Sequence, residues 1–153
     1  KFFFELPNDG DIVFTPTVEK SEVITENEFL TNNSACEVLI AEDEEYSYEL
    51  LNIIIGDLGI KTHWVKNGQE AIDFCKSNNN ISLILMDINM PVLDGYSATK
   101  EIKKLYPDIP IIAQTAFAIA GDREKSIKAG CEDYITKPID PEKLTSIILN
   151  YCS

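Results

Sequence analysis

The clearest pattern in the sequence begins at Glu37, where short apolar runs alternate with longer segments whose apolar residues recur at helical spacing. Short continuous apolar runs bounded by turn residues are typical of strands that are buried on both faces. We therefore expect five strands, which cover Val38–Ala41, Thr62–Val65, Leu83–Met86, Ile109–Ala113 and Asp133–Thr136.

A segment of helical period follows each expected strand. The first helix is expected over Glu45–Leu58 and should stop at Gly59, because glycine readily adopts the left-handed conformation that closes many helices. The last should begin at Asp140-Pro141, an N-cap residue followed by a proline suited to the first helical position. The other three are expected over about 69–76, 96–105 and 120–129. Five such repeats predict an α/β fold, a doubly wound five-stranded parallel sheet with helices on both faces.

The first part of the chain has a different texture. Residues 8–36 are rich in Asn, Asp, Glu, Thr and Ser with only scattered apolar residues, which is the composition of a polar linker. The folded module is therefore expected to cover residues 37–153. Residues 1–7 read Lys-Phe-Phe-Phe-Glu-Leu-Pro, and the glutamate and proline in this segment are unlike a signal peptide.

The charge of the chain restricts its partners. Its 26 acidic residues minus its 13 basic residues give a formal charge of -13. Such a chain lacks the positive surface that nucleic acids and anionic lipids attract, so we expect no nucleic-acid binding and no direct membrane contact. No apolar run approaches the roughly 18 residues that a membrane helix needs. We expect a soluble, cytoplasmic protein.

The four cysteines, Cys36, Cys75, Cys131 and Cys152, form no recognisable motif. None is paired in a CxxC spacing, and the single histidine leaves little for a zinc site. We expect them to behave as small buried or surface apolar residues in a reducing compartment. At this length the core is also expected to form without disulfides.

Polar residues follow four of the five expected strands. Glu42 and Asp43 follow the first, Asp87 the third, Thr115 the fourth and Lys137 the fifth. Ligands of doubly wound sheets bind at the carboxyl ends of the strands, so these side chains should meet in one crevice. Three carboxylates so close together would repel one another without a cation, and their hard oxygen atoms suit Mg²⁺, which Mn²⁺ could replace.

This set also predicts a reaction. With the cation present, Asp87 can attack an electrophilic phosphorus, while Lys137, the Thr115 hydroxyl and nearby backbone N–H groups hold the phosphoryl oxygens. A single acidic residue at a strand end is more often a helix N-cap, and Asp43 could serve as one. The joint placement of acids, a hydroxyl and a lysine at one edge favours the reactive interpretation.

Four stretches resemble the receiver domain of two-component signalling, the phosphoacceptor of response regulators. They are Val38-Leu39-Ile40-Ala41-Glu42-Asp43, Leu85-Met86-Asp87-Ile88-Asn89-Met90-Pro91-Val92-Leu93-Asp94-Gly95, Ile111-Ile112-Ala113-Gln114-Thr115-Ala116 and Asp133-Tyr134-Ile135-Thr136-Lys137-Pro138. The resemblance covers residues 37–153. It implies the flavodoxin-like strand order 2-1-3-4-5.

The resemblance also implies roles for individual residues. Asp87 would take a phosphoryl group from a phosphohistidine, and Asp43, Asp87 and the Asn89 carbonyl would hold Mg²⁺, with Glu42 contributing through water. Thr115, the Ala116 N–H and Lys137 would bind the phosphoryl oxygens, and the Lys137-Pro138 peptide would be cis. Thr115 and Tyr134 would form the switch that responds to phosphorylation. The implied partners are the phosphohistidine domain of a histidine kinase and a histidine phosphotransfer protein.

The N-terminal segment carries a second resemblance. Residues 1–7 look like the last strand of a histidine-kinase ATP-binding domain, so that the chain would be the C-terminal receiver of a hybrid histidine kinase, whose parent could be a membrane-anchored sensor. A generic hydrophobic arm is the alternative. We expect this arm to be extended and packed through its aromatic rings, more readily between two chains than within one, which would give a homodimer.

Three other functions fit parts of the pattern. A flavodoxin-like cofactor binder would need a hydroxyl- and glycine-rich phosphate loop, whereas here the loop after the first strand is acidic. A haloacid-dehalogenase-type phosphatase would carry a second aspartate at the position of Asn89. A receiver that acts mainly as an interaction or regulatory module of its parent kinase is the third, and a phosphoryl-uptake test would distinguish it. His63 is expected to be a partly buried strand residue rather than a phosphodonor.

Overall fold

The computed structural model describes residues 36–116 and 121–152. The expected arm at residues 1–7, most of the expected linker and the homodimer through the arm lie outside the described residues. The elements are β1 (Glu37–Ala41), α3 (Glu45–Gly56), β2 (Lys61–Val65), α4 (Gly68–Ser77), β3 (Leu83–Asp87), α5 (Gly95–Leu105), β4 (Ile111–Thr115), α6 (Asp122–Ala129), β5 (Asp133–Thr136) and α7 (Pro141–Cys152).

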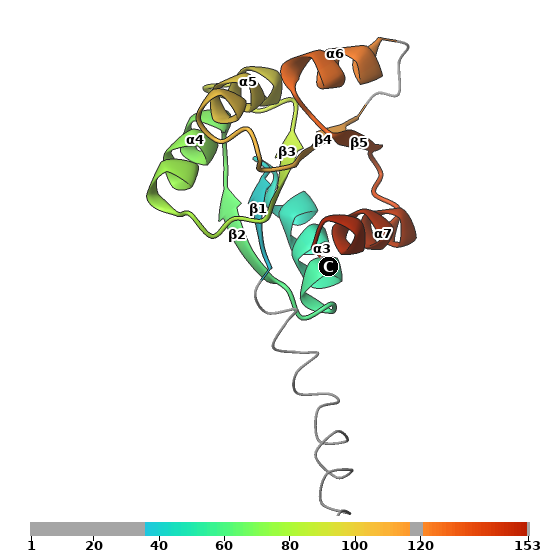
Figure 1. The fold of residues 1–153 in the computed structure, drawn as a ribbon. Coiled ribbons are helices and arrows are strands. Elements are labelled where there is room, and N and C mark those ends of the chain that lie inside the picture. The colour runs from blue at the N-terminus through green and yellow to red at the C-terminus, as the bar shows by residue number, and fades with distance from the viewer. Residues whose placement is uncertain (1–35, 117–120, 153) are drawn as a thin grey trace, which may run out of the picture. The chain divides into compact units, whose positions relative to one another are not determined.

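The strands form one parallel sheet in the order β2-β1-β3-β4-β5, which confirms the predicted fold. Helices α3 and α7 cover one face, and α4, α5 and α6 lie on the other (Figure 1). Every residue of β3 and β4 is buried, because helices pack on both sides of the sheet. The continuous apolar runs in the sequence have this physical origin.

Two apolar clusters form the core, one on each face. Alternate residues of β1 divide between them: Leu39 packs toward α4 and α5, whereas Val38 and Ile40 pack toward α3 and α7. This alternation follows from the period of a strand, which directs successive side chains to opposite faces. Among residues 36–116 and 121–152, no helix is long and apolar enough to span a membrane.

Local polar groups set several helix boundaries. Asn67 caps α4 by accepting a hydrogen bond from the Glu70 N–H at 2.8 Å, and Asp94 caps α5 through the Ser97 N–H at 2.9 Å. Helix α3 ends at Gly56, earlier than the predicted Leu58, and a turn follows in which Gly59 adopts a φ of 77°. The prediction that Gly59 closes the helix was wrong, because Asp57 is the C-cap and Gly59 closes the turn that follows.

The expectation for the cysteines was wrong for two of the four. Cys36 and Cys152 form a disulfide, with Cα atoms 5.7 Å apart, while Cys75 and Cys131 are buried free thiols. Cys36, expected as the last linker residue, is 4% exposed and belongs to the core cluster beneath α3 and α7. The pair was missed because its members are separated by 116 residues, and only the folded sheet brings the start of β1 to the end of α7.

Candidate functional site

The polar residues singled out in the sequence gather at the carboxyl ends of the strands. Asp87 is the last residue of β3 and Thr115 the last of β4, while Glu42 and Lys137 directly follow β1 and β5. The parallel register places these ends side by side, since Asp87 lies opposite Gln114 in β4 and Thr115 lies opposite Thr136 in β5. The sheet therefore delivers residues from four strands to one edge.

Three carboxylates form the acidic centre of the site. One oxygen from each of Glu42, Asp43 and Asp87 lies within 4.8 Å of the others. Glu42 is fully buried and Asp87 is 5% exposed, whereas Asp43 is exposed. Burial raises the pKa of Glu42 to about 7, and burial likewise raises the pKa of Asp87 above its usual value. A divalent cation fits such a donor set, because it would supply the positive charge that these groups need to be ionised together.

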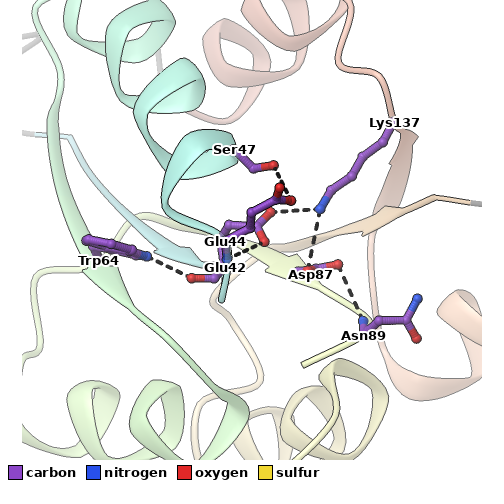
Figure 2. A network of polar contacts seen from close by, with 7 residues as sticks. All are labelled: Glu42, Glu44, Ser47, Trp64, Asp87, Asn89 and Lys137. Atoms are coloured by element: carbon purple, nitrogen blue, oxygen red, sulfur yellow. Dashed lines mark hydrogen bonds and ion pairs between the residues drawn. The ribbon is translucent and has the colours of Figure 1, made fainter. Parts of the chain in front are cut away.

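Lys137 supplies one positive charge to this centre. Its Nζ lies 2.8 Å from Glu42 Oε2 and 3.5 Å from Asp87 Oδ2 (Figure 2). Burial works to lower the pKa of Lys137, but the hydrogen bond to Glu42 and the charge of Asp87 outweigh it, and the pKa is raised overall. The Lys137-Pro138 peptide is cis, as the resemblance implied. The lysine is therefore a fixed cation that faces both buried carboxylates.

Contacts to the backbone orient Glu42. Its Oε1 accepts a hydrogen bond from the Glu44 N–H at 3.1 Å, and its carbonyl oxygen accepts one from the indole of Trp64 at 2.8 Å (Figure 2). The Trp64 ring is stacked on Tyr48, with ring centroids 4.2 Å apart. Sequence reasoning gave Trp64 no role, because its contact depends on β2 lying beside β1.

The loop after β3 completes the acidic side of the site. The Asn89 N–H lies 3.4 Å from Asp87 Oδ1 and donates to it (Figure 2). Gly95 packs directly against the backbone of Asp87 and Ile88, and a Cβ atom at this position would overlap both. Its own N–H donates to the Ile88 carbonyl at 2.9 Å. Gly95 is a supporting residue that the sequence interpretation quoted within a motif but gave no role.

The remaining expected residues lie along β4 and β5. Thr115 is 4% exposed, and its hydroxyl lies 3.4 Å from Asp122 Oδ2 at the start of α6. Ala116 follows it and is exposed. Tyr134 is half-buried in β5 and packs against the core cluster on the α4–α5 face. His63, as expected, is a partly buried residue of β2, where its Nε2 lies 3.1 Å from Glu37 Oε1.

Known proteins share both the sequence pattern and the fold of this chain. The family model described as the response regulator receiver domain matches residues 38–149. Hybrid signal transduction histidine kinase I of Dictyostelium discoideum is 40% identical in a 119-residue alignment that covers 72% of this chain and 7% of that protein. The chain thus corresponds to a small part of this relative.

Two solved structures share the fold. The receiver domain of Ssk1 from Saccharomyces cerevisiae, in a complex with the histidine phosphotransfer signalling protein Ypd1, is 31% identical with a TM-score of 0.73 over 76% of this chain and 88% of that one. The receiver domain of the sensor histidine kinase PA1611 from Pseudomonas aeruginosa PAO1 is 36% identical with a TM-score of 0.70, over 76% and 96% of the two chains. That structure has a magnesium ion coordinated in its active-site cleft.

Proposed function

The chain belongs to the response regulator receiver domain family and acts in two-component phosphorelay signalling, and we propose that Asp87 is the residue that accepts the phosphoryl group. The main support is the position of its carboxylate at the end of β3, 3.5 Å from Lys137 and within 4.8 Å of the other two acids. Glu42 is the other buried carboxylate at this edge, but its Oε2 is already bound to Lys137 at 2.8 Å.

The reaction that fits this site is a transfer from a phosphohistidine. A carboxylate oxygen of Asp87 attacks the phosphorus while the phosphorus–nitrogen bond breaks, and the imidazole leaves with the electron pair of that bond. Lys137 neutralises charge on the phosphoryl oxygens, and the Thr115 hydroxyl and the Ala116 N–H provide donors beside them. The raised pKa of Asp87 means that its ionised form, the nucleophile, needs nearby positive charge.

We assign Mg²⁺ to the acidic centre. Asp43, Asp87 and the Asn89 carbonyl would hold it, with Glu42 contributing through water, and Mn²⁺ could take its place. When bound, the cation would offset the repulsion among the carboxylates and draw electron density from the phosphoryl group. The support comes from the three carboxylate oxygens that lie within 4.8 Å of one another and from the magnesium in the 36% identical PA1611 receiver.

Intact mass after incubation with Mg²⁺ and acetyl phosphate tests the assignment. We expect the wild-type chain to gain one phosphoryl group and an Asp87→Asn variant to gain none. Asp57→Asn changes an exposed aspartate after α3 and is the matched control, so it should behave as wild type. Uptake by the Asp87→Asn variant would show that another residue is the acceptor. Absence of uptake by the wild type would favour the alternative, a module that regulates its parent kinase by binding alone.

Phosphorylation is proposed to act through Thr115 and Tyr134. A phosphoryl group on Asp87 would attract the Thr115 hydroxyl away from Asp122, which it now faces at 3.4 Å. The half-buried Tyr134 ring could then turn inward and change the surface formed by α6, β5 and α7. A change in the NMR environment of Tyr134 on phosphorylation, absent in Thr115→Ala, is the expected result.

The partner that we propose is a histidine phosphotransfer protein. Helix α3 exposes a row of apolar side chains, Tyr46, Leu50 and Ile53, which are 78%, 39% and 61% exposed. The row begins beside the site, since Tyr46 and Leu50 line a cavity of about 140 Å³ together with Lys137. A related receiver forms a complex with such a protein, Ypd1. This apolar row is suited to packing against a helix of the partner.

Phosphorylated Ypd1 provides a direct probe of this surface. We expect Ile53→Asp to slow transfer from phosphorylated Ypd1 while leaving uptake from acetyl phosphate intact. Ile127→Asp is the matched control, because Ile127 is similarly exposed, at 54%, but lies on α6. Equal slowing by both substitutions would argue against docking on α3.

The parent protein is proposed to be a hybrid histidine kinase. The support is the 40% identity to a segment of hybrid kinase I and the aromatic segment at residues 1–7. Because phosphohistidine is made from ATP, this parentage places the domain in the cytoplasm, below a sensor that could be membrane-anchored. Sequencing the coding region upstream of Lys1 tests it: an ATP-binding domain and a helix with a phosphodonor histidine are expected.

A further inference from the structure

Two cysteines join the ends of the folded module at a place remote from the phosphoryl site. Cys36 directly precedes β1 and Cys152 is the last residue of α7. Their Cα atoms are 5.7 Å apart, within the range of natural disulfides, and the structure bonds them. The phosphoryl site, at the carboxyl ends of the strands, is separated from Cys36 by the full length of β1, about 17 Å for a five-residue strand.

We propose that Cys36 and Cys152 form a reversible thiol–disulfide site that exchanges with low-molecular-mass thiols and disulfides of the glutathione type. The disulfide form ties the point where the preceding 35 residues are attached to the end of the last helix. In the dithiol form, only side-chain packing holds the start of β1 against the end of α7. The redox state of the surroundings thus sets how firmly the two ends of the domain are held together.

The two sulfurs differ in access, which gives the exchange an order. Cys36 is 4% exposed, whereas Cys152 is half-buried. A small thiolate attacks the Cys152 sulfur, the sulfur–sulfur bond breaks, and Cys36 leaves as a thiolate that takes up a proton. A second thiolate then attacks the small-molecule sulfur of the mixed disulfide, which forms the oxidised small molecule and releases Cys152 as a thiolate that takes up a proton. Two small thiols are oxidised for each protein disulfide reduced, and oxidation runs the same steps backwards.

The other two cysteines are unsuited to this exchange. Cys75 is 1% exposed and Cys131 is 6% exposed. Burial raises the pKa of each thiol to about 11, so little of the reactive thiolate is present at neutral pH. The reactive pair is therefore selected by the proximity of its two sulfurs and by the access to Cys152, since Cys36 itself is as buried as the two free cysteines.

The cross-link should have a large effect on stability, because it closes a long stretch of chain. Its ends are separated by 116 residues, and a loop of this length loses much of its freedom in the unfolded state when it is closed. For a domain of this size we expect the oxidised form to melt about 10 °C above the reduced form.

The test equilibrates the full chain in buffers that range from reduced to oxidised glutathione. Free thiols are then alkylated in denaturant, and the protein is analysed by intact mass and peptide mapping. We expect a single transition in which Cys36 and Cys152 change together while Cys75 and Cys131 stay alkylatable. Cys152→Ser should abolish the transition and the redox dependence of the melting temperature, and Cys75→Ser, the matched control, should retain both.

Four results would overturn the proposal. The pair could stay reduced in excess oxidised glutathione, or it could stay oxidised in excess reduced glutathione, so that the site would not exchange. The melting temperatures of the two forms could also coincide. NMR adds a check on location: backbone amide shifts should differ between the forms near Glu37 and Tyr151 and agree at Asp87, and a large change at Asp87 would contradict a site remote from the chemistry.

Discussion

Removing the charge of Glu42 should change how the stability of the metal-free domain depends on pH. Glu42 is fully buried, and burial raises its pKa from an ordinary 4.5 to about 7 in spite of the hydrogen bond from Lys137. A carboxyl whose pKa is higher in the folded state binds its proton more tightly there. Its contribution to stability is therefore fully present below pH 4.5 and is lost as the pH rises to about 7.

The size of the effect follows from the shift. A shift from 4.5 to about 7 corresponds to at most about 3 kcal/mol, of which about 2.5 kcal/mol should be lost between pH 5 and pH 8. In Glu42→Gln the side chain has no proton to lose, so this part of the pH dependence should disappear. Glu49→Gln, which changes an exposed glutamate on α3, is the matched control and should keep it.

Urea unfolding in the presence of a chelator, at pH 5, 6, 7 and 8, measures the free energy of unfolding of each variant. The difference between wild type and Glu42→Gln reports Glu42 together with its effect on the pKa values of Asp87 and Lys137, because the more distant titrating groups are common to both. Added Mg²⁺ should stabilise wild type more at pH 8 than at pH 5, since ionised carboxylates bind the cation. If wild type and Glu42→Gln lose the same free energy between pH 5 and pH 8, the argument from burial is refuted.

Three further predictions concern neighbours of the site. Trp64 is the only tryptophan, and its indole donates to the Glu42 carbonyl, so its fluorescence should change when Mg²⁺ is titrated into wild type but not into Asp43→Asn. An identical response of both proteins would contradict ligation by Asp43. Gly95→Ala should lower the free energy of unfolding by about 1–3 kcal/mol, because the new Cβ would overlap the backbone of Asp87 and Ile88. Gly56→Ala has open space around the new Cβ and should not lower it, so equal losses in urea unfolding would rule out the overlap. Gln114 is fully buried, and its amide nitrogen and oxygen both lack hydrogen-bond partners, so Gln114→Met should stabilise the domain by about 1 kcal/mol. A loss of stability in the same assay would show that the amide is hydrogen-bonded in solution.

Much of this protein could be predicted from its sequence because the relevant signals are local. The apolar runs of β3 and β4 indicated buried strands, since a strand covered on both faces has no solvent-facing positions. Once the strands were assigned as parallel, their carboxyl ends had to share one edge of the sheet. Asp87, Thr115 and Lys137 were therefore predictable as neighbours, and the structure brings them to that edge.

Other features depended on contacts between segments that are distant in the sequence. Glu42 and Lys137 were expected at the same edge, but the hydrogen bond between these residues, 95 positions apart, was not predictable, nor was the one from Trp64 to the Glu42 carbonyl. Cys36 and Cys152 had no motif to identify them, and their pairing arises only because β1 starts where α7 ends. Sequence pattern determines the period and burial of each element, whereas partners across the sheet, and the electrostatics that follow from them, are decided by how the elements pack.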